Sequence, residues 1–224
     1  MDVNRLNVIL DLDNTIINSL EPSEIKLIDP SFISLAKTPE PEEFQAKFMF
    51  ADMEPYFRVF ARPGLDAFLD YLFEYYNVGV WTAAESEYAL FIIRHFIETK
   101  PNRRLKFIFY RYHVDGAEKR YGEGKIKDLR LLWEHYKLFH VYPCNTILID
   151  DLIDVKTTNP LNVFRLKSFD VLKGSHPNMN AVTDRELENV KDTLEELRVK
   201  YKPSRCTVRD KFIPILGSID REER

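Results

Sequence analysis

Short apolar runs that alternate with longer segments of helical periodicity constrain the fold of this chain more than any other feature. The apolar runs, each expected to be a buried strand, cover residues 6–12, 78–81, 106–110, 146–149 and 162–166. The longer segments space their apolar side chains as amphipathic helices do and cover residues 63–76, 85–97, 126–136 and 184–201. Strands that alternate with helices of this length form a parallel sheet with helices on both faces. The sequence therefore predicts an α/β fold with a central parallel sheet.

One region, residues 20–60, does not follow this alternation. Most of it carries scattered prolines and charges, too irregular for a crossover helix, and it closes with the alternating run 56–60. We interpret 20–60 as a cap-like insertion with short strands after the first strand. The chain of 224 residues then fits one domain, 1–224, that includes this insertion and a C-terminal extension over 202–224.

Composition excludes several classes of protein. The net charge of -4, from 32 Lys+Arg and 36 Asp+Glu, argues against a broad basic surface, so direct binding of nucleic acid is not expected. No apolar stretch approaches the roughly 20 residues that cross a bilayer, so no membrane partner is expected. Two cysteines, Cys144 and Cys206, are too few for the disulfide framework of a small secreted domain, and we expect them to be buried thiols. A soluble, intracellular protein of the cytoplasm or nucleus is predicted.

The strongest chemical signal is the motif Asp11-Leu12-Asp13-Asn14-Thr15, which directly follows the first apolar run. Residues two apart in an extended segment point the same way, so Asp11 and Asp13 can face one pocket at the carboxyl end of a strand. Ligands of parallel α/β sheets bind at that edge. Two carboxylates in one pocket repel each other unless a cation intervenes, and Mg²⁺, which prefers oxygen ligands, fits best.

This pair supplies the groups needed to transfer a phosphoryl group. Asp11 is ionised at neutral pH and needs no neighbouring base to attack phosphorus. Asp13 can protonate the leaving oxygen and later activate water. The alternative is structural, with both aspartates capping a turn and Thr15 starting a helix.

Polar residues at the ends of later strands favour the catalytic interpretation. Thr82 can donate its hydroxyl to a phosphate oxygen, Lys127 or Lys125 can neutralise the phosphate charge, and Asp150 with Asp151 can complete a metal site. A phosphate loop around Gly116, Gly122 and Gly124 is a weaker candidate, because the spacing is not that of a Walker motif. A surface loop before a helix is expected there.

The order Asp11/Asp13, Thr82, Lys127, Asp150/Asp151 resembles the four motifs of the haloacid dehalogenase (HAD) superfamily of aspartyl-phosphate phosphatases. The chain is most similar to the small C-terminal-domain phosphatases, also called NLI-interacting-factor-like. The segments that carry this resemblance are LDLDNTIINS, ARPGLDAFL, VWTAAESEYA and KIKDLRLL. The resemblance runs from Val8 to about Leu197 and implies a HAD-like Rossmannoid three-layer sandwich.

The resemblance implies a Mg²⁺-dependent phosphatase of phosphorylated Ser or Thr in peptides, typified by the tail repeats of RNA polymerase II. By the same resemblance, Asp11 is the nucleophile and a metal ligand. Asp13 is the general acid and base, with its backbone carbonyl on the metal. Thr82 and Lys127 hold the phosphate, and Asp150 and Asp151 bind the metal. In the alignment, Arg111 falls close to the position of a family arginine that contacts phosphopeptide.

The sequence also departs from that family. Asn14 stands where Glu is frequent, and Asp151 stands where a metal-binding Asn is common. An aspartate at 151 keeps an oxygen ligand and adds negative charge. The insertion does not match the family's hydrophobic wall that selects proline beside the phosphorylated residue. A HAD phosphatase of nucleic-acid ends or small metabolites, or a non-catalytic phosphopeptide-binding scaffold, therefore stays open as an alternative.

Overall fold

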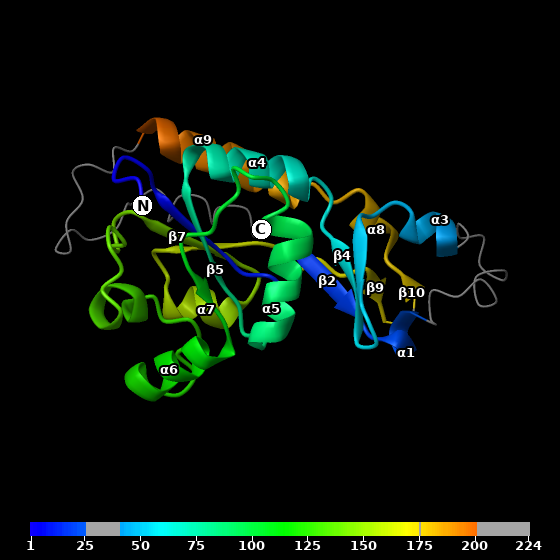
Figure 1. Cartoon of the computed structure of the whole chain (residues 1–224), viewed down its shortest axis with the longest axis horizontal. Coiled ribbons are helices and arrows are strands. Elements are labelled where there is room, and N and C mark those ends of the chain that lie inside the picture. The colour runs from blue at the N-terminus through cyan, green and yellow to red at the C-terminus, as the bar shows by residue number, and fades with distance from the viewer. Residues whose placement is uncertain (26–40, 175, 201–224) are drawn as a thin grey trace.

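Five parallel strands form the central sheet of the computed structural model, which describes residues 1–25, 41–174 and 176–200 (Figure 1). The strands are β1 (Asn7–Leu10), β5 (Asn77–Trp81), β6 (Ile108–Phe109), β7 (Thr146–Asp150) and β8 (Val163–Arg165). Their order is β6-β5-β1-β7-β8, and every neighbouring pair is parallel. Each of the five predicted strands is present, so the predicted parallel sheet is confirmed.

Helices cover both faces of this sheet. One face packs against α4 (Leu65–Tyr75), α5 (Ser86–Ile92) with the π-helical turn η2 (Ile93–Ile97), and α9 (Glu186–Lys200). The other face packs against α6 (Arg111–Tyr121), the π-helical turn η3 (Leu131–His135) and α7 (Ile153–Thr158). Of these, α6 and α7 lie in the lower part of Figure 1. Successive strand residues serve opposite faces, as Val8 and Ile9 show by packing in different clusters. The three-layer α/β fold is therefore confirmed.

A second, antiparallel sheet stands beside the end of β1. It consists of β2 (Ile17–Leu20), β4 (Phe57–Ala61) and β3 (Phe50–Met53) in the order β2-β4-β3. Near it lie α1 (Pro22–Ile25), α3 (Pro41–Gln45), α8 (Met179–Val182) and the pair β9 (Leu172–Lys173) and β10 (His176–Pro177), at the right of Figure 1. The buried side chains of this region form a cluster of their own: Leu20, Phe44, Phe48, Phe60, Phe169, Val171 and Ala181.

The expected β-containing insertion after the first strand is therefore present. The division into a single domain with an insertion over 20–60 stays a prediction, and the extension over 202–224 lies outside the described residues.

The segment before β7 contains less helix than the sequence predicts. A helix was expected over 126–136, but only Leu131–His135 forms a helical turn, and Lys127 has a left-handed backbone with φ 49°. The leucine spacing at 129 and 132 is helical, but a left-handed residue cannot continue a right-handed helix. The surface loop expected from Gly116 onward begins only at Gly122, because Gly116 lies inside α6.

The structure bears on two expectations drawn from composition, which concern the cysteines and membrane-spanning helices. Cys144 is buried, as expected, but it is disulfide-bonded, so the expectation of a free thiol there is wrong. Cys206 lies outside the described residues. Within the described part of the chain, no helix combines the length and the apolar character that a membrane span requires.

Candidate active site

The carboxyl ends of three neighbouring strands bring the predicted residues to one edge of the sheet. Asp11 follows β1, Thr82 follows β5 and Asp150 ends β7. The register aligns these ends, because Leu10 pairs with both Val80 and Ile149. The parallel sheet thus joins residues that lie far apart in the sequence.

Lys127 links two of these strand ends. Its Nζ atom donates to Asp11 Oδ1 at 2.5 Å and to Asp150 Oδ2 at 2.7 Å. Lys127 and Asp150 are almost fully buried. Burial alone would lower the pKa of Lys127, but the charges of Asp11 and Asp150 raise it above its usual value. The side chain is therefore a buried ammonium held between two carboxylates.

Three carboxylates form a cluster around this ammonium. One oxygen from each of Asp11, Asp150 and Asp151 lies within 4.8 Å of the others. Burial, and then the charge of Asp11, raises the pKa of both Asp150 and Asp151. Lys127 balances one of these three negative charges, which leaves two. A divalent cation with oxygen ligands therefore fits the cluster and would relieve the repulsion.

Thr15, the last residue of the first motif, also belongs to this cluster. Its hydroxyl is fully buried and lies 3.0 Å from Asp11 Oδ2 and 3.3 Å from Asp151 Oδ1. Asp11 is thus held by Lys127 on one oxygen and by Thr15 on the other. The sequence pattern contained Thr15 as the last position of the motif, but this role was not predicted.

Asp13 faces a different partner from Asp11. Its Oδ1 atom accepts a hydrogen bond of 2.5 Å from the Tyr88 hydroxyl, which also contacts the Ser19 hydroxyl. Burial, opposed by this hydrogen bond and reinforced by the charge of Asp11, raises the pKa of Asp13 to about 6. A carboxyl group with such a pKa exchanges protons near neutral pH, as a general acid and base must.

Tyr88 is a residue that the sequence analysis missed as part of the site. Its position on an apolar helical face indicated core packing, and its ring does contact Phe57 of β4, with ring centres 5.5 Å apart. Only its hydroxyl reaches Asp13. No local pattern records that contact, because it joins residues 75 positions apart.

Thr82 and Arg111, the two residues predicted to contact phosphate and peptide, both bond to Ala84 in the turn after β5. Thr82 is buried, and its hydroxyl accepts the Ala84 N–H at 3.1 Å, which shapes the turn after β5. Arg111, at the start of α6, donates its backbone N–H to Ala84 O. Its side chain is half exposed and lies 3.9 Å from Glu85. Thr82 and Arg111 therefore flank one turn, and their predicted contacts with substrate stay predictions.

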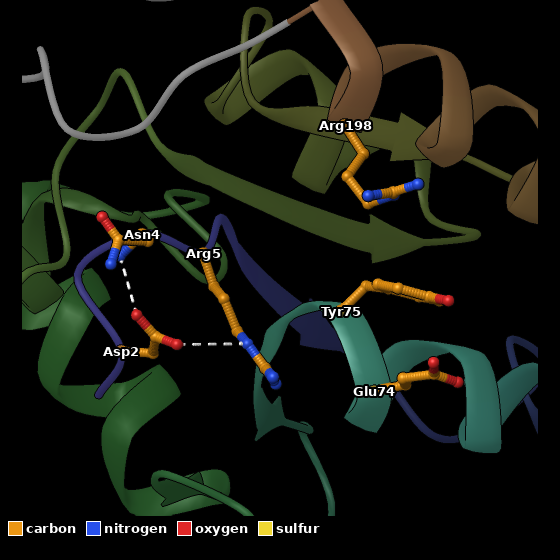
Figure 2. A pocket seen from close by; sticks show the side chains of 6 residues that line it. All are labelled: Asp2, Asn4, Arg5, Glu74, Tyr75 and Arg198. Carbon is orange, nitrogen blue, oxygen red and sulfur yellow. Dashed lines mark hydrogen bonds and ion pairs between the residues drawn. The ribbon is translucent and has the colours of Figure 1, made fainter.

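A separate hollow lies away from these strand ends (Figure 2). It is lined by Asp2, Asn4, Arg5, Glu74, Tyr75 and Arg198, from the N-terminal segment and the C-terminal ends of α4 and α9. Its two arginines already face carboxylates, since Arg5 pairs with Asp2 and Arg198 pairs with Glu195. The hollow contains none of the predicted site residues.

Comparisons with known proteins agree with this geometry. A family model for NLI interacting factor-like phosphatases matches residues 6–205. A putative CTD phosphatase-like protein 355R of Invertebrate iridescent virus 6 is 37% identical over 190 residues, which cover 84% of this chain and 96% of the relative. Its namesake in Invertebrate iridescent virus 3 is 34% identical over 196 residues, 85% of this chain and 96% of the relative.

Solved structures show the same fold. The structure of Fcp1, described as an essential RNA polymerase II CTD phosphatase, superposes with a TM-score of 0.59 at 19% identity. The match covers 89% of this chain but 63% of the Fcp1 chain. A structure of fission yeast Fcp1 bound to beryllium fluoride gives a TM-score of 0.58 at 19% identity, over 89% of this chain and 64% of that one. From the family model and the viral relatives, the chain belongs to the NLI interacting factor-like phosphatases.

Proposed function

We propose that this protein is a Mg²⁺-dependent protein Ser/Thr phosphatase that works through an aspartyl-phosphate on Asp11. The observation that carries the proposal is the buried Lys127 ammonium between Asp11 and Asp150, beside the carboxylate of Asp151. A lysine in this place positions the nucleophile and offers positive charge to an incoming phosphate. A protein with a net negative charge can thereby bind an anionic substrate through the positive charge of this one side chain.

The proposed reaction has two steps. An oxygen of Asp11 attacks phosphorus, and the bond from phosphorus to the Ser or Thr oxygen breaks while Asp13 gives that oxygen a proton. Asp13 then takes a proton from water, the water oxygen attacks phosphorus, and inorganic phosphate leaves as Asp11 is regenerated. Thr82 and Lys127 hold the phosphate oxygens, and Arg111 contacts the peptide beside it.

Mg²⁺ fits the donor set, and in the proposal it is held by the carboxylates of Asp11, Asp150 and Asp151 with the backbone carbonyl of Asp13. When bound, the ion supplies positive charge that stabilises the transferring phosphoryl group. Thr15 orients Asp11 and Asp151 toward the same point through its hydroxyl.

The proposed substrate is a phosphorylated Ser or Thr peptide, of the kind found in the tail of RNA polymerase II. Support comes from the family membership and from the description of Fcp1 as an RNA polymerase II CTD phosphatase. The purified protein should release phosphate faster from a Ser-Pro phosphopeptide than from a 3′-phosphorylated oligonucleotide or from sugar phosphates. Faster turnover of the oligonucleotide or of a sugar phosphate would instead support a HAD phosphatase of those substrates. Peptide binding without turnover of any phosphoester would support a scaffold.

Removal of divalent cations should abolish turnover. Without a cation, the three clustered carboxylates repel each other and an incoming phosphate, so EDTA treatment should lower kcat by at least about a thousandfold. Phosphate release measured before and after addition of MgCl₂ to the dialysed protein checks this. Full activity in EDTA, with metal content verified by mass spectrometry, would contradict the proposed metal site.

A further inference from the structure

The backbone of Lys127 adopts a conformation that side-chain-bearing residues rarely take. Its φ of 49° lies in the left-handed region, where the β-carbon crowds the following carbonyl. Lys127 lies in the loop between α6 and η3, so no helix or strand fixes this conformation. Residues persist in such conformations when surrounding contacts hold them there, and this occurs mainly at functional sites.

The contact that holds this loop comes from Asn159, just after α7. Its Nδ2 atom donates to the Lys127 carbonyl at 3.0 Å, and its Oδ1 atom accepts the Leu129 N–H at 3.0 Å. The same Nδ2 atom lies 3.2 Å from the Val155 carbonyl, and the side chain is buried. The carboxamide therefore pairs with the backbone on both sides of Asp128, much as a neighbouring peptide group in a sheet would.

Helix α7 connects Asn159 to Asp150, which pairs with the Lys127 ammonium. At its N-terminal end, the Leu152 N–H donates to Asp150 Oδ1 at 2.9 Å. At its C-terminal end, Asn159 holds Lys127 through the backbone. One short helix thus fixes both groups of the buried Lys127–Asp150 ion pair.

We propose that Asn159 is a positioning residue that keeps the Lys127 ammonium between Asp11 and Asp150. Its effect on turnover rests on the proposed function of Lys127 in holding phosphate. Its effect on the loop does not. Without the carboxamide, the loop loses the hydrogen bonds at the Lys127 carbonyl and at the Leu129 N–H, the left-handed backbone of Lys127 relaxes, and the ammonium moves away from Asp11.

The first test measures the burial of the ammonium and needs no substrate. An amine-acylating reagent should modify Lys127 slowly in the wild type, with the exposed Lys137 as internal reference. Asn159→Ala should raise the rate at Lys127 by about tenfold or more, because local opening of the loop becomes easier. Peptide mass spectrometry reads both lysines in one sample.

Asn162→Ala is the matched control for this substitution. Asn162 is equally buried, at 8% exposure, and its Nδ2 atom donates to two backbone carbonyls, those of Pro143 and Thr146, each at 2.8 Å. It lies three positions from Asn159, and neither of these two hydrogen bonds reaches the Lys127 loop. General destabilisation should therefore affect both variants alike, whereas exposure of Lys127 should follow only Asn159→Ala.

The second test measures turnover at a temperature where thermal melts show every variant folded. Asn159→Ala should lower kcat by about tenfold or more relative to Asn162→Ala. Asn159→Asp, which keeps the acceptor for Leu129 but places an oxygen against the Lys127 carbonyl, should show a similar loss. Equal acylation of Lys127 in the Asn159→Ala and Asn162→Ala proteins would overturn the proposal, even if neither protein hydrolyses a phosphoester. Exposure of Lys127 without a loss of kcat would instead count against the role proposed for the lysine.

Discussion

Asp11→Asn is expected to abolish phosphatase turnover while the protein stays folded. The amide cannot attack phosphorus as a carboxylate does, so kcat should fall by at least about 10⁴-fold. The structure gives the reason for retained folding. The new amide oxygen can still accept from Lys127 Nζ, and the Thr15 hydroxyl can turn to accept from the amide nitrogen.

The same substitution should change the charges that remain. The Asp11 carboxylate is one of the causes that raise the pKa values of Asp13, Asp150 and Asp151. Its removal lowers the repulsion in the cluster but also takes one charge partner from the buried Lys127 ammonium, so the metal-free variant should unfold at a temperature close to that of the wild type.

Phosphate release and thermal melting, measured on the same preparation, check both results. Asp192→Asn, at an exposed position of α9, is the control for loss of an aspartate, and it should leave both quantities unchanged. The wild type, quenched in acid during turnover of a radiolabelled phosphopeptide, should carry label that hydroxylamine removes. Residual turnover within about a hundredfold of the wild type would rule out Asp11 as the nucleophile.

Arg62→Ala should cause the largest loss of stability among single substitutions around the site. Arg62 follows β4 and is almost fully buried, and its guanidinium makes two hydrogen bonds of 2.8 Å to Asp184. It also donates to the carbonyls of Thr15 at 2.9 Å and Lys167 at 3.0 Å. Removing the guanidinium leaves a largely buried carboxylate and two carbonyls without this donor, so the free energy of unfolding should fall by about 3–5 kcal/mol.

Arg58→Ala, in strand β4 just before Arg62, offers a control for the loss of an arginine. Arg58 also makes a two-bonded ion pair, at 2.6 and 2.9 Å, with Asp52. That pair is partly exposed, with side-chain exposures of 24% and 37%, so its loss should cost about 1 kcal/mol or less. Urea denaturation of the two variants and the wild type gives both values. A loss at Arg62 no larger than that at Arg58 would show that burial does not set the strength of this contact.

Arg62 also bears on the site through Thr15. The guanidinium holds the Thr15 carbonyl, and the Thr15 hydroxyl holds Asp11. Arg62→Lys keeps the charge but cannot make all four hydrogen bonds, so it should lower turnover while it retains more stability than Arg62→Ala.

The five buried strands, the helices over 63–76, 85–97 and 184–201, and the sheet edge that carries the candidate site could be predicted from sequence alone, whereas α6 and α7 were not predicted. Apolar runs of four to seven residues predicted the buried strands, and the amphipathic periods of α4 and α9 predicted helices on one face. Asp11, Thr82 and Asp150 were predictable as neighbours because the carboxyl ends of parallel strands meet at one edge. These features are local or follow from general rules of sheet topology.

The contacts that hold the side chains at that edge could be seen only in the folded protein. Lys127 reaches Asp11 across 116 positions, Tyr88 reaches Asp13 across 75, and Asn159 reaches Lys127 across 32. The prediction of a helix over 126–136 was wrong for the same reason. Lys127 has a left-handed backbone, and its carbonyl bonds to the distant Asn159, a contact that the local leucine spacing does not record. Periodicity in a sequence records which face of an element is buried, whereas a polar contact between distant segments depends on the folded backbone that brings them together.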